Sequence, residues 1–398
     1  MKRVEIVGMG TGQDTLTIEA LTAIKDAEVL LGAPRMLHLA SDFYGGVTKR
    51  MYPYYLPKET ADAIAAEDAE RFVVLVSGDV GFYSAATELS DALSAYDIRF
   101  IAGVSTVNAF FAKLRLPWQS AAFVSAHGRE TDVVSHVRRN RLTFCLTGNN
   151  VRAIGTTLVR AGLGEVKTYV GENLGTEEER IYETSAENLA DAASLTVLLF
   201  QNEAFDDRTP TGLPDSRFTR FEGIPMTKSE TRALIMSKLN LSPTSICWDI
   251  GAGSGSVTVE MALGAYLGHV YAIERREDSM PLIEQNCASF HIGNVTAICG
   301  TAPDALEGLP IPDAAFIGGS GGEIGNIIAA VLNKNPNARI VITAVTIETV
   351  SLSMEALKDA GADTEITQIS AARGRKVGGL HLMEAQNPVS IICAGGSR

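Results

Sequence analysis

The chain has 398 residues, of which 46% are hydrophobic, and its formal net charge is −13. This length predicts two or three domains, and the hydrophobic content is enough for at least two substantial cores. The acidic balance argues against nucleic acid as the main partner, because phosphate binding needs a basic face. No run approaches the ~18 apolar residues that a membrane helix needs, so no membrane partner is expected either.

The five cysteines are odd in number and form no C-x-x-C pair, so neither a disulfide framework nor a zinc site is expected. No cluster of His, Cys, Asp and Glu has metal-ligand spacing, and we therefore predict no metal. The N-terminus does not resemble a signal peptide, because Gly8 interrupts its short apolar run. These features favour a cytoplasmic location.

Strand-like apolar runs alternate with amphipathic stretches along almost the whole chain, which predicts an α/β fold. The stretch 206–222 breaks this rhythm with charge, proline and glycine, which indicates a linker between one domain over 1–205 and another over 223–398. In the first domain the expected strands are Val4–Val7, Phe72–Val76, Ile98–Ile101, Ala121–Val124, Thr143–Leu146, Lys167–Val170 and Thr196–Phe200, and the expected helices include Ser84–Leu93 and Val151–Arg160.

Three glycine-containing turns leave strands of the first domain, at Gly8–Gly12, Ser77–Ser84 and Gly103–Thr106. Turns at the ends of neighbouring strands could line a single crevice. An alternative role for the last turn is a helix N-cap. His127, just past a later strand, could contact substrate or be a hydrogen-bonded turn histidine. The residues expected to contact a cofactor in this crevice are Gly10, Thr11, Gly78, Asp79, Val80, Ser105 and Thr106.

The second domain restarts the α/β pattern. Thr227 and Glu230 have the spacing of a capping box, followed by a helical pattern to Leu239. Each domain thus has its own strand and glycine loop, as in two enzymes in tandem. The strands expected here are Ile246–Ile250, His269–Ile273, Val295–Ile298, Ala314–Ile317, Arg339–Thr343 and Val389–Cys393.

The strand Ile246–Ile250 ends in the loop Gly251-Ala252-Gly253-Ser254-Gly255, and a helix is expected from about Ser256. Glycines let the backbone pass close beneath a ligand, and a helix N-terminus offers free N–H groups. The dinucleotide fingerprint G-x-G-x-x-G fails here at Ser256 and in the first domain at Gln13, which counts against a nicotinamide oxidoreductase. We therefore interpret the loop as a site for S-adenosylmethionine and the chain as a methyltransferase.

Three further strand ends extend this second site. Glu274 closes the next strand and can accept both ribose hydroxyls, the alternative being a solvated charge at a strand end. The turn at Ala302 follows the third strand, where it would flank the adenine. Gly318–Gly322 follows the fourth strand, which favours a substrate cavity beside the cofactor, the alternative being a flexible loop. The expected substrate contacts there are Gly319, Ser320 and Gly321.

The first domain resembles the tetrapyrrole methylases of cobalamin and sirohaem synthesis. Its departures from the usual pattern are Thr11 and Val80, which stand where proline is common. The likeness rests on Gly8–Gly12, Ser77–Ser84, Gly103–Thr106, Ser125–Arg129 and Val170–Thr176, the last two being similar to the subfamily that acts on precorrin-6Y or its cobalt counterpart.

The second domain resembles the decarboxylating methyltransferase that acts with those enzymes. This likeness rests on Gly223–Lys228, the Gly251–Gly255 loop, Ala302-Pro303, Gly318–Gly322 and Ala371–Lys376. It implies that Thr227, residues 251–255, Glu274 and Ala302 contact S-adenosylmethionine.

The two resemblances together imply a two-lobed tetrapyrrole methylase fold, then a Rossmann-like class I methyltransferase fold, with two S-adenosylmethionine sites per chain. They imply methylation at C5 by the first domain. They assign to the second domain methylation at C15 and loss of the C12 acetate carboxylate. Association into a homo-oligomer through the second domains is also implied. In the alternative, only the C-terminal half is catalytic and the N-terminal half binds tetrapyrrole or serves assembly.

Such a macrocycle carries several carboxylates, so an acidic protein must gather positive charge locally to hold it. Arg373, Arg375 and Lys376 are three basic residues in four positions, and arginine can bind carboxylates through two hydrogen bonds. We predict that Arg373 and Arg375 bind substrate carboxylates, the alternative being a solvated basic turn.

Overall fold

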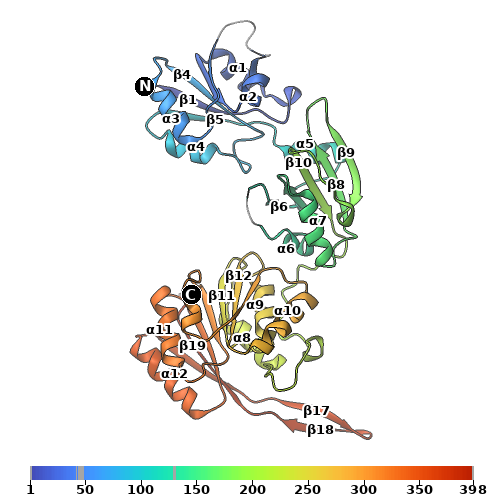
Figure 1. Ribbon diagram of the computed structural model, residues 1–398, viewed down its shortest axis with the longest axis vertical. Helices are drawn as coiled ribbons and strands as arrows, with labels where there is room; N and C mark the ends of the chain where they lie inside the picture. Colours follow the sequence, from blue (N-terminus) through green and yellow to red (C-terminus); the bar gives the residue numbers. More distant parts are fainter. Residues whose placement is uncertain (1, 42, 44–48, 129–130, 397–398) are drawn as a thin grey trace. The chain divides into compact units, whose positions relative to one another are not determined.

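The computed structural model describes residues 2–41, 43, 49–128 and 131–396, so Arg129 lies outside the described residues. The chain divides into two compact units, Met1–Phe205 and Asp206–Arg398 (Figure 1). Both are α/β, and the described part of neither unit holds a helix that is long and apolar enough to span a membrane.

The N-terminal unit has two lobes, and the first is built on a five-stranded parallel sheet in the order β3-β2-β4-β1-β5. Alternate side chains of each strand point to opposite faces, so Val7 packs with α1 and α2 whereas Ile6 packs with α3 and α4. The elements are β1 (Arg3–Gly8), α1 (Ile18–Asp26), β2 (Val29–Gly32), α2 (Pro34–Ser41), β3 (Arg50–Tyr52), α3 (Pro57–Ala66), β4 (Arg71–Val76), α4 (Ala86–Ala92) and β5 (Asp97–Ile101).

The second lobe has a mixed sheet in the order β6-β7-β10-β8-β9, in which β6 and β7 are parallel and the other neighbours antiparallel. Phe110 and Phe111 of α5 pack on one face, and α6 and α7 cover the other. The elements are α5 (Thr106–Leu114), β6 (Ala122–Ser125), α6 (Val133–Arg139), β7 (Leu142–Leu146), α7 (Val151–Arg160), β8 (Lys167–Glu172), β9 (Arg180–Ser185) and β10 (Thr196–Gln201).

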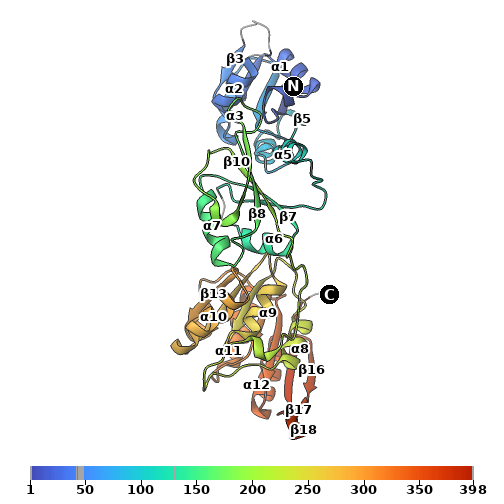
Figure 2. The same ribbon diagram turned by 90° about the vertical axis from the view of Figure 1, so that its right-hand side faces the viewer.

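The C-terminal unit has a seven-stranded sheet in the order β13-β12-β11-β14-β15-β19-β16, parallel except at β19. Buried Trp248 faces α11 and α12, and buried Phe316 faces α8 and α9, so helices cover both faces (Figure 2). The elements are α8 (Ser229–Leu239), β11 (Ile246–Ile250), α9 (Ser256–Gly264), β12 (His269–Glu274), α10 (Met280–Ser289), β13 (Val295–Cys299), β14 (Ala314–Ile317), α11 (Ile324–Lys334), β15 (Arg339–Ala344), α12 (Ile347–Asp359), β16 (Thr364–Ile369) and β19 (Val389–Ala394).

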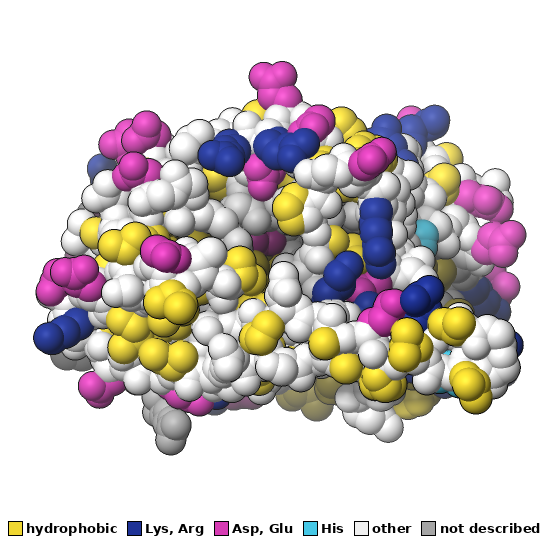
Figure 3. Space-filling view, turned by 90° about the horizontal axis from the view of Figure 1, so that it is seen from below, with side chains coloured by type: hydrophobic (Ala, Val, Ile, Leu, Met, Phe, Trp, Pro, Cys, Tyr) yellow, Lys and Arg dark blue, Asp and Glu magenta, His cyan; other side chains and the backbone are white. Residues whose placement is uncertain are grey.

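A separate two-stranded ribbon, β17 (Ala372–Val377) and β18 (Leu380–Ala385), projects from this unit in Figure 1. It carries exposed hydrophobic side chains, with Leu380 77% and Met383 62% accessible. Figure 3 shows hydrophobic and charged side chains interspersed at the surface. The ribbon therefore presents apolar side chains that the rest of the C-terminal unit does not cover.

The strands expected from the sequence are all present within one or two residues, which confirms the α/β fold class. The capping-box prediction is wrong, because α8 begins at Ser229 and its N-cap position is Lys228, which makes no side-chain cap bond. Part of the stretch expected as a linker packs into the C-terminal unit, where Leu213 and Phe218 are buried beside α10.

Candidate functional site

Three turns of the first lobe meet backbone to backbone. Gly10 and Gly78 exchange two hydrogen bonds, each with an N–O distance of 3.0 Å. A Cβ atom on Gly103 would lie 2.2 Å from the carbonyl oxygen of Gly78, so this approach requires glycine. The Asp79 carboxylate accepts hydrogen bonds from the N–H groups of Gly81 (2.8 Å) and Gly103 (3.2 Å). Asp79 thus fastens the second turn to the third.

These turns line a pocket of ≈300 Å³ that the second lobe closes with Leu146, Thr147 and the start of β10. Val80 is not in its lining and packs instead against the hydrophobic cluster below α3 and α4. The expected residues that do line the pocket are Gly10, Thr11, Gly78, Asp79, Ser105, Thr106 and His127.

Ser105 and His127 each make the structural contact considered for them and also line the pocket, while their contact with a ligand stays a prediction. The Ser105 hydroxyl accepts a hydrogen bond from the N–H of Asn108 (3.2 Å) and so caps α5, while the residue also lines the pocket. The His127 Nδ1 lies 3.1 Å from the carbonyl oxygen of Thr147, which fixes the ring at the pocket wall. Helix capping and ring anchoring therefore position these side chains for a ligand.

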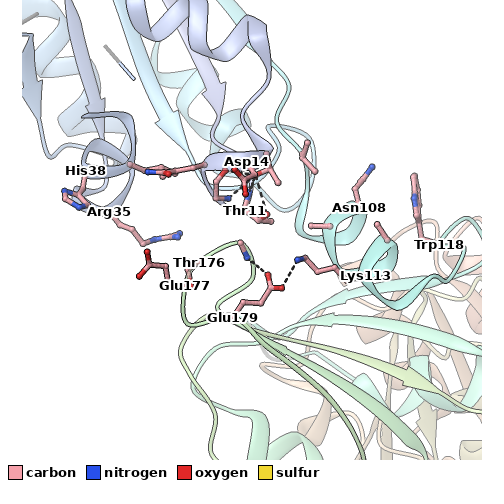
Figure 4. Close-up of a pocket in the computed structure, with 18 of the residues that line it drawn as sticks. Thr11, Asp14, Arg35, His38, Asn108, Lys113, Trp118, Thr176, Glu177 and Glu179 are labelled. Atoms are coloured by element: carbon pink, nitrogen blue, oxygen red, sulfur yellow. Dashed lines mark hydrogen bonds and ion pairs between the residues drawn. The ribbon is translucent and has the colours of Figure 1, made fainter. Parts of the chain in front are cut away.

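A larger cavity of ≈1290 Å³ adjoins this pocket and shares Thr11 and Arg35 with it (Figure 4). Its walls come from the first lobe, from α5 and from the loop after β8. That loop is pinned by Glu179, whose carboxylate accepts from the Gly175 N–H (2.7 Å) and pairs with Lys113 Nζ (2.7 Å). The pocket of ≈300 Å³ thus opens beside a space several times larger.

The glycine loop of the C-terminal unit lies at the carboxyl end of β11. Gly251 has φ +77°, and a Cβ atom there would lie 2.6 Å from the backbone nitrogen of Gly319. The N–H groups of Gly251 and Ala252 donate to the carbonyl of Ile273 at 2.8 and 3.1 Å. The loop is therefore clamped between the ends of β12 and β14, and only glycine fits at its start.

Glu274 holds this loop from the neighbouring strand. Its side chain is only 8% exposed, and its carboxylate accepts from the N–H groups of Gly253 (2.9 Å) and Arg276 (3.1 Å). Glu274 is therefore not a solvated strand-end charge.

The surrounding pocket measures ≈310 Å³. Ser254 and Gly255 are not in its lining: Ser254 is buried and Gly255 packs against Ile283. The expected residues that do line it are Thr227, Gly251, Ala252, Gly253, Glu274, Ala302, Gly319, Ser320 and Gly321.

A buried carboxylate that sequence reasoning missed lies directly below the loop. Asp249 is fully buried, and its Oδ2 accepts a hydrogen bond from the Thr258 hydroxyl (2.5 Å). Burial raises the pKa of this carboxyl to about 7, and the nearby charge of Glu274 adds to the rise. An acidic residue two positions before the first glycine was the available signal.

The structure does not bring Arg373 and Arg375 into either pocket. The Arg373 guanidinium pairs with Asp215 (2.7 Å) and Glu230 (2.5 Å), and Arg375 pairs with Glu384 across the ribbon. Arg373 thus joins the ribbon to the start of α8. Substrate binding by these two residues stays a prediction.

Sequence reasoning also did not single out three residues that line these cavities. Arg35 borders both cavities of the N-terminal unit, and Pro225 and Arg275 line the C-terminal pocket. For Arg35 the available signal was Gly32-Ala33-Pro34 after a short apolar run. Within the described ranges, no group of three or more His, Cys, Asp or Glu residues could hold a metal ion.

Comparison with known proteins covers both units. The family model of tetrapyrrole (corrin/porphyrin) methylases matches residues 3–190, and that of the precorrin methyltransferase domain matches residues 220–394. The precorrin-6Y C(5,15)-methyltransferase [decarboxylating] of Sinorhizobium sp is 30% identical over 395 residues, which cover 97% of this chain and 94% of the relative.

Two further relatives match about half of the chain. A probable cobalt-precorrin-6B C(15)-methyltransferase (decarboxylating) of Pyrobaculum calidifontis is 42% identical over 46% of this chain and 95% of its own length. The crystal structure of a precorrin-6y C5,15-methyltransferase from Geobacter metallireducens is 38% identical over 47% of this chain and 97% of that chain, with a TM-score of 0.44. By its match over nearly its whole length to the Sinorhizobium enzyme, the chain belongs to the family of decarboxylating precorrin-6Y C(5,15)-methyltransferases.

Proposed function

We propose that this chain transfers methyl groups from S-adenosylmethionine to C5 and C15 of precorrin-6Y and removes the C12 acetate carboxylate, which gives precorrin-8X. The N-terminal unit methylates C5, and the C-terminal unit methylates C15 and decarboxylates. The observation that carries the proposal is that each unit has its own pocket of about 300 Å³ at the carboxyl ends of parallel strands. On this basis the proposal includes two cofactor sites per chain.

The chemistry suits sites with few ionisable groups. Each methyl group leaves the sulfonium without the electrons of its C–S bond, and a ring carbon supplies the pair for the new bond. In decarboxylation the C–CO₂ bond electrons enter the conjugated ring, which then takes up a proton. Alignment and exclusion of water are the main requirements, and glycine turns with closely packed walls meet them.

Glu274 supports a cofactor role for the C-terminal pocket. Its carboxylate is already oriented by two backbone N–H groups, and it has lone pairs left for a ribose. In the N-terminal pocket, the glycine turns bring backbone groups to the ligand space, as a methionine or adenine moiety needs. Thr11 and Val80 depart from the usual family pattern, and Thr11 still lines the pocket.

The alternative, in which only the C-terminal half is catalytic, is less well supported. A tetrapyrrole methylase model matches residues 3–190, and the Sinorhizobium relative, whose name covers both positions, matches this half as well.

The decisive experiment counts cofactors and methyl groups in the full-length chain. Calorimetric titration with S-adenosylhomocysteine is expected to give two sites per chain. Turnover with precorrin-6Y and labelled S-adenosylmethionine is expected to add two methyl groups and release one carbon dioxide, read by product mass. One site and one added methyl would support the alternative, and binding of a nicotinamide dinucleotide would overturn the assignment.

We also propose that the chain is cytoplasmic and forms a homo-oligomer, and that neither nucleic acid nor membrane is a partner. The exposed side chains of Leu380 and Met383 on the β17–β18 ribbon supply apolar surface for a second copy. Light scattering of the full chain, compared with an L380S/M383S variant, tests the self-association. A monomeric mass for the unmodified chain would exclude it.

A further inference from the structure

Arg35 is the second residue of α2, and it lines both the small pocket and the larger cavity of the N-terminal unit. Its guanidinium donates a hydrogen bond to the uncharged hydroxyl of Ser77 (3.2 Å). In the ranges that the structure describes, no carboxylate oxygen lies within 4.0 Å of this group. A permanently charged side chain thus stands at the junction of two cavities, and no carboxylate of the described residues pairs with it.

The other strongly basic residue of the larger cavity is differently placed. Lys113 is neutralised by Glu179, which the Gly175 N–H also holds. Figure 4 shows Arg35 extending from α2 towards the loop of Thr176 and Glu177, with Lys113 and Glu179 joined further along. Lys113 therefore helps to hold the loop that forms one wall of the cavity, whereas Arg35 faces the interior of the cavity.

The environment of Arg35 favours an anionic ligand. Although the side chain is solvent-accessible, the protein around it desolvates the guanidinium and lowers its pKa below the ordinary arginine value. A carboxylate would replace the hydration that the guanidinium has lost, and the planar guanidinium can bind it through two parallel hydrogen bonds.

We propose that Arg35 binds a carboxylate of the tetrapyrrole in the larger cavity and so turns the acceptor carbon towards the methyl donor in the small pocket. This inference rests on the proposed function. The cavity volumes, ≈1290 Å³ against ≈300 Å³, favour the macrocycle over the cofactor as the ligand of the larger space. Arg35 is then a positioning and specificity residue for the C5 step.

Two other sources of a carboxylate must be separated from the substrate. The methionine part of the cofactor carries a carboxylate, and Arg35 also borders the small pocket. Glu177 lies on the facing loop, so Arg35 could instead act as a latch that pairs with it when the loop moves. R35M removes the charge, R35K keeps the charge but loses the planar fork, and E177Q removes the latch partner.

The test uses the full-length chain and reads each step separately. R35M is expected to raise the KM for precorrin-6Y in the C5 step by about 10- to 100-fold, as expected for loss of a charged hydrogen-bonded pair. The affinity of R35M for S-adenosylhomocysteine should stay within about twofold of that of the unmodified chain. The product mass should still show the reaction of the C-terminal unit. R35K should fall between R35M and the unmodified chain. The matched control is R152M, because Arg152 is exposed on α7 and pairs with Asp191.

Three results would overturn the inference. Weaker S-adenosylhomocysteine binding in R35M would assign Arg35 to the cofactor carboxylate. A loss in E177Q equal to that in R35M would make Arg35 a loop latch. An unchanged KM in folded R35M, checked by circular dichroism, would leave it without a role. Failure of the proposed function itself would be seen differently, as absence of the C5 methyl from the product of the unmodified chain.

Discussion

The two pockets of this chain are nearly equal in volume but are constructed differently. In the N-terminal unit, three turns contact one another through their backbones, and a second sheet closes the pocket. In the C-terminal unit, one glycine loop is clamped at the edge of a single sheet and is tied to a buried carboxylate. The shape of the N-terminal pocket therefore depends on how the two sheets of that unit are packed together. The shape of the C-terminal pocket depends on neighbouring strand ends of one sheet.

The two units can also be compared by how deeply their ion pairs are buried. Ion pairs of the N-terminal unit include solvent-exposed ones such as Arg141–Glu203, with side chains 57% and 60% accessible. The C-terminal unit contains Arg232, which is fully buried and pairs with Glu260 and with Asp215. Glu260 also accepts from the N–H groups of Gly212 and Leu213. This network anchors the segment before α8 to the core, and Arg232 also donates to the carbonyl of Thr227 at the pocket.

The largest effect is expected from R232M, which would leave the Glu260 carboxylate buried without its cationic partner and would remove one of the cations that pair with Asp215. Breaking a buried pair in this way costs about 3–5 kcal/mol of unfolding free energy, whereas R141M should cost less than about 1 kcal/mol. Because the chain has two tryptophans, Trp248 fluorescence in a W118F background reports urea unfolding of the C-terminal unit for R232M, and Trp118 fluorescence in a W248F background reports the N-terminal unit for R141M. A loss below about 1 kcal/mol in R232M would show that the network contributes little.

Next in size is the effect of G251A on cofactor binding. The added methyl group would meet the Gly319 backbone at 2.6 Å, so affinity for S-adenosylhomocysteine at this site should fall about 100-fold. Calorimetry should then show one tight site in place of two, with C5 methylation retained. G308A is the matched control, because Gly308 also has positive φ (+73°) but nothing within 4 Å of the added atom. Equal losses in both variants would point to backbone strain alone.

The contrast between the pockets also explains what sequence could predict. Buried strands such as β14 are continuous apolar runs, so they and the glycine turns that follow them were predictable. Strand β9 and the β17–β18 ribbon are largely polar or exposed, and no apolar run marks them. The apparent capping box failed because Ser229 and Glu230 bond to Arg373, more than 140 residues away. Contacts between residues this far apart in sequence depend on the tertiary structure, so no local pattern predicts them.

A smaller loss of cofactor affinity is expected when either acidic residue that holds a loop, Glu274 or Asp79, is replaced. E274A removes the acceptor of the Gly253 N–H and the expected ribose acceptor together, so affinity at the C-terminal site should fall about 10-fold or more. D79A removes acceptors of Gly81 and Gly103, while the two Gly10–Gly78 bonds remain, and should cost less than E274A. Site-resolved titration, read with C5 and C15 product masses, compares them. A larger loss in D79A would reverse the proposed difference in construction.

The smallest effect, taken per pH unit, is expected from Asp249. Because burial raises the folded-state pKa of its carboxyl to about 7 from an ordinary 3.8, the folded chain holds a proton between these values that the unfolded chain has lost. Its contribution to stability is therefore full below about pH 4 and falls as the pH rises to 7, by roughly 1 kcal/mol per pH unit. D249N should abolish this slope and keep an acceptor for the Thr258 hydroxyl, whereas D363N, at an exposed position, should not change it. Urea midpoints from pH 5 to 8, followed by Trp248 fluorescence, measure the slope. If the unfolding free energy of the unmodified chain and of D249N changed equally with pH, Asp249 would be ionised beneath the loop. The Gly251–Gly255 loop would then lie beside two buried negative charges, those of Asp249 and Glu274. The N-terminal pocket, whose turns are held by backbone contacts, would differ from it in this respect.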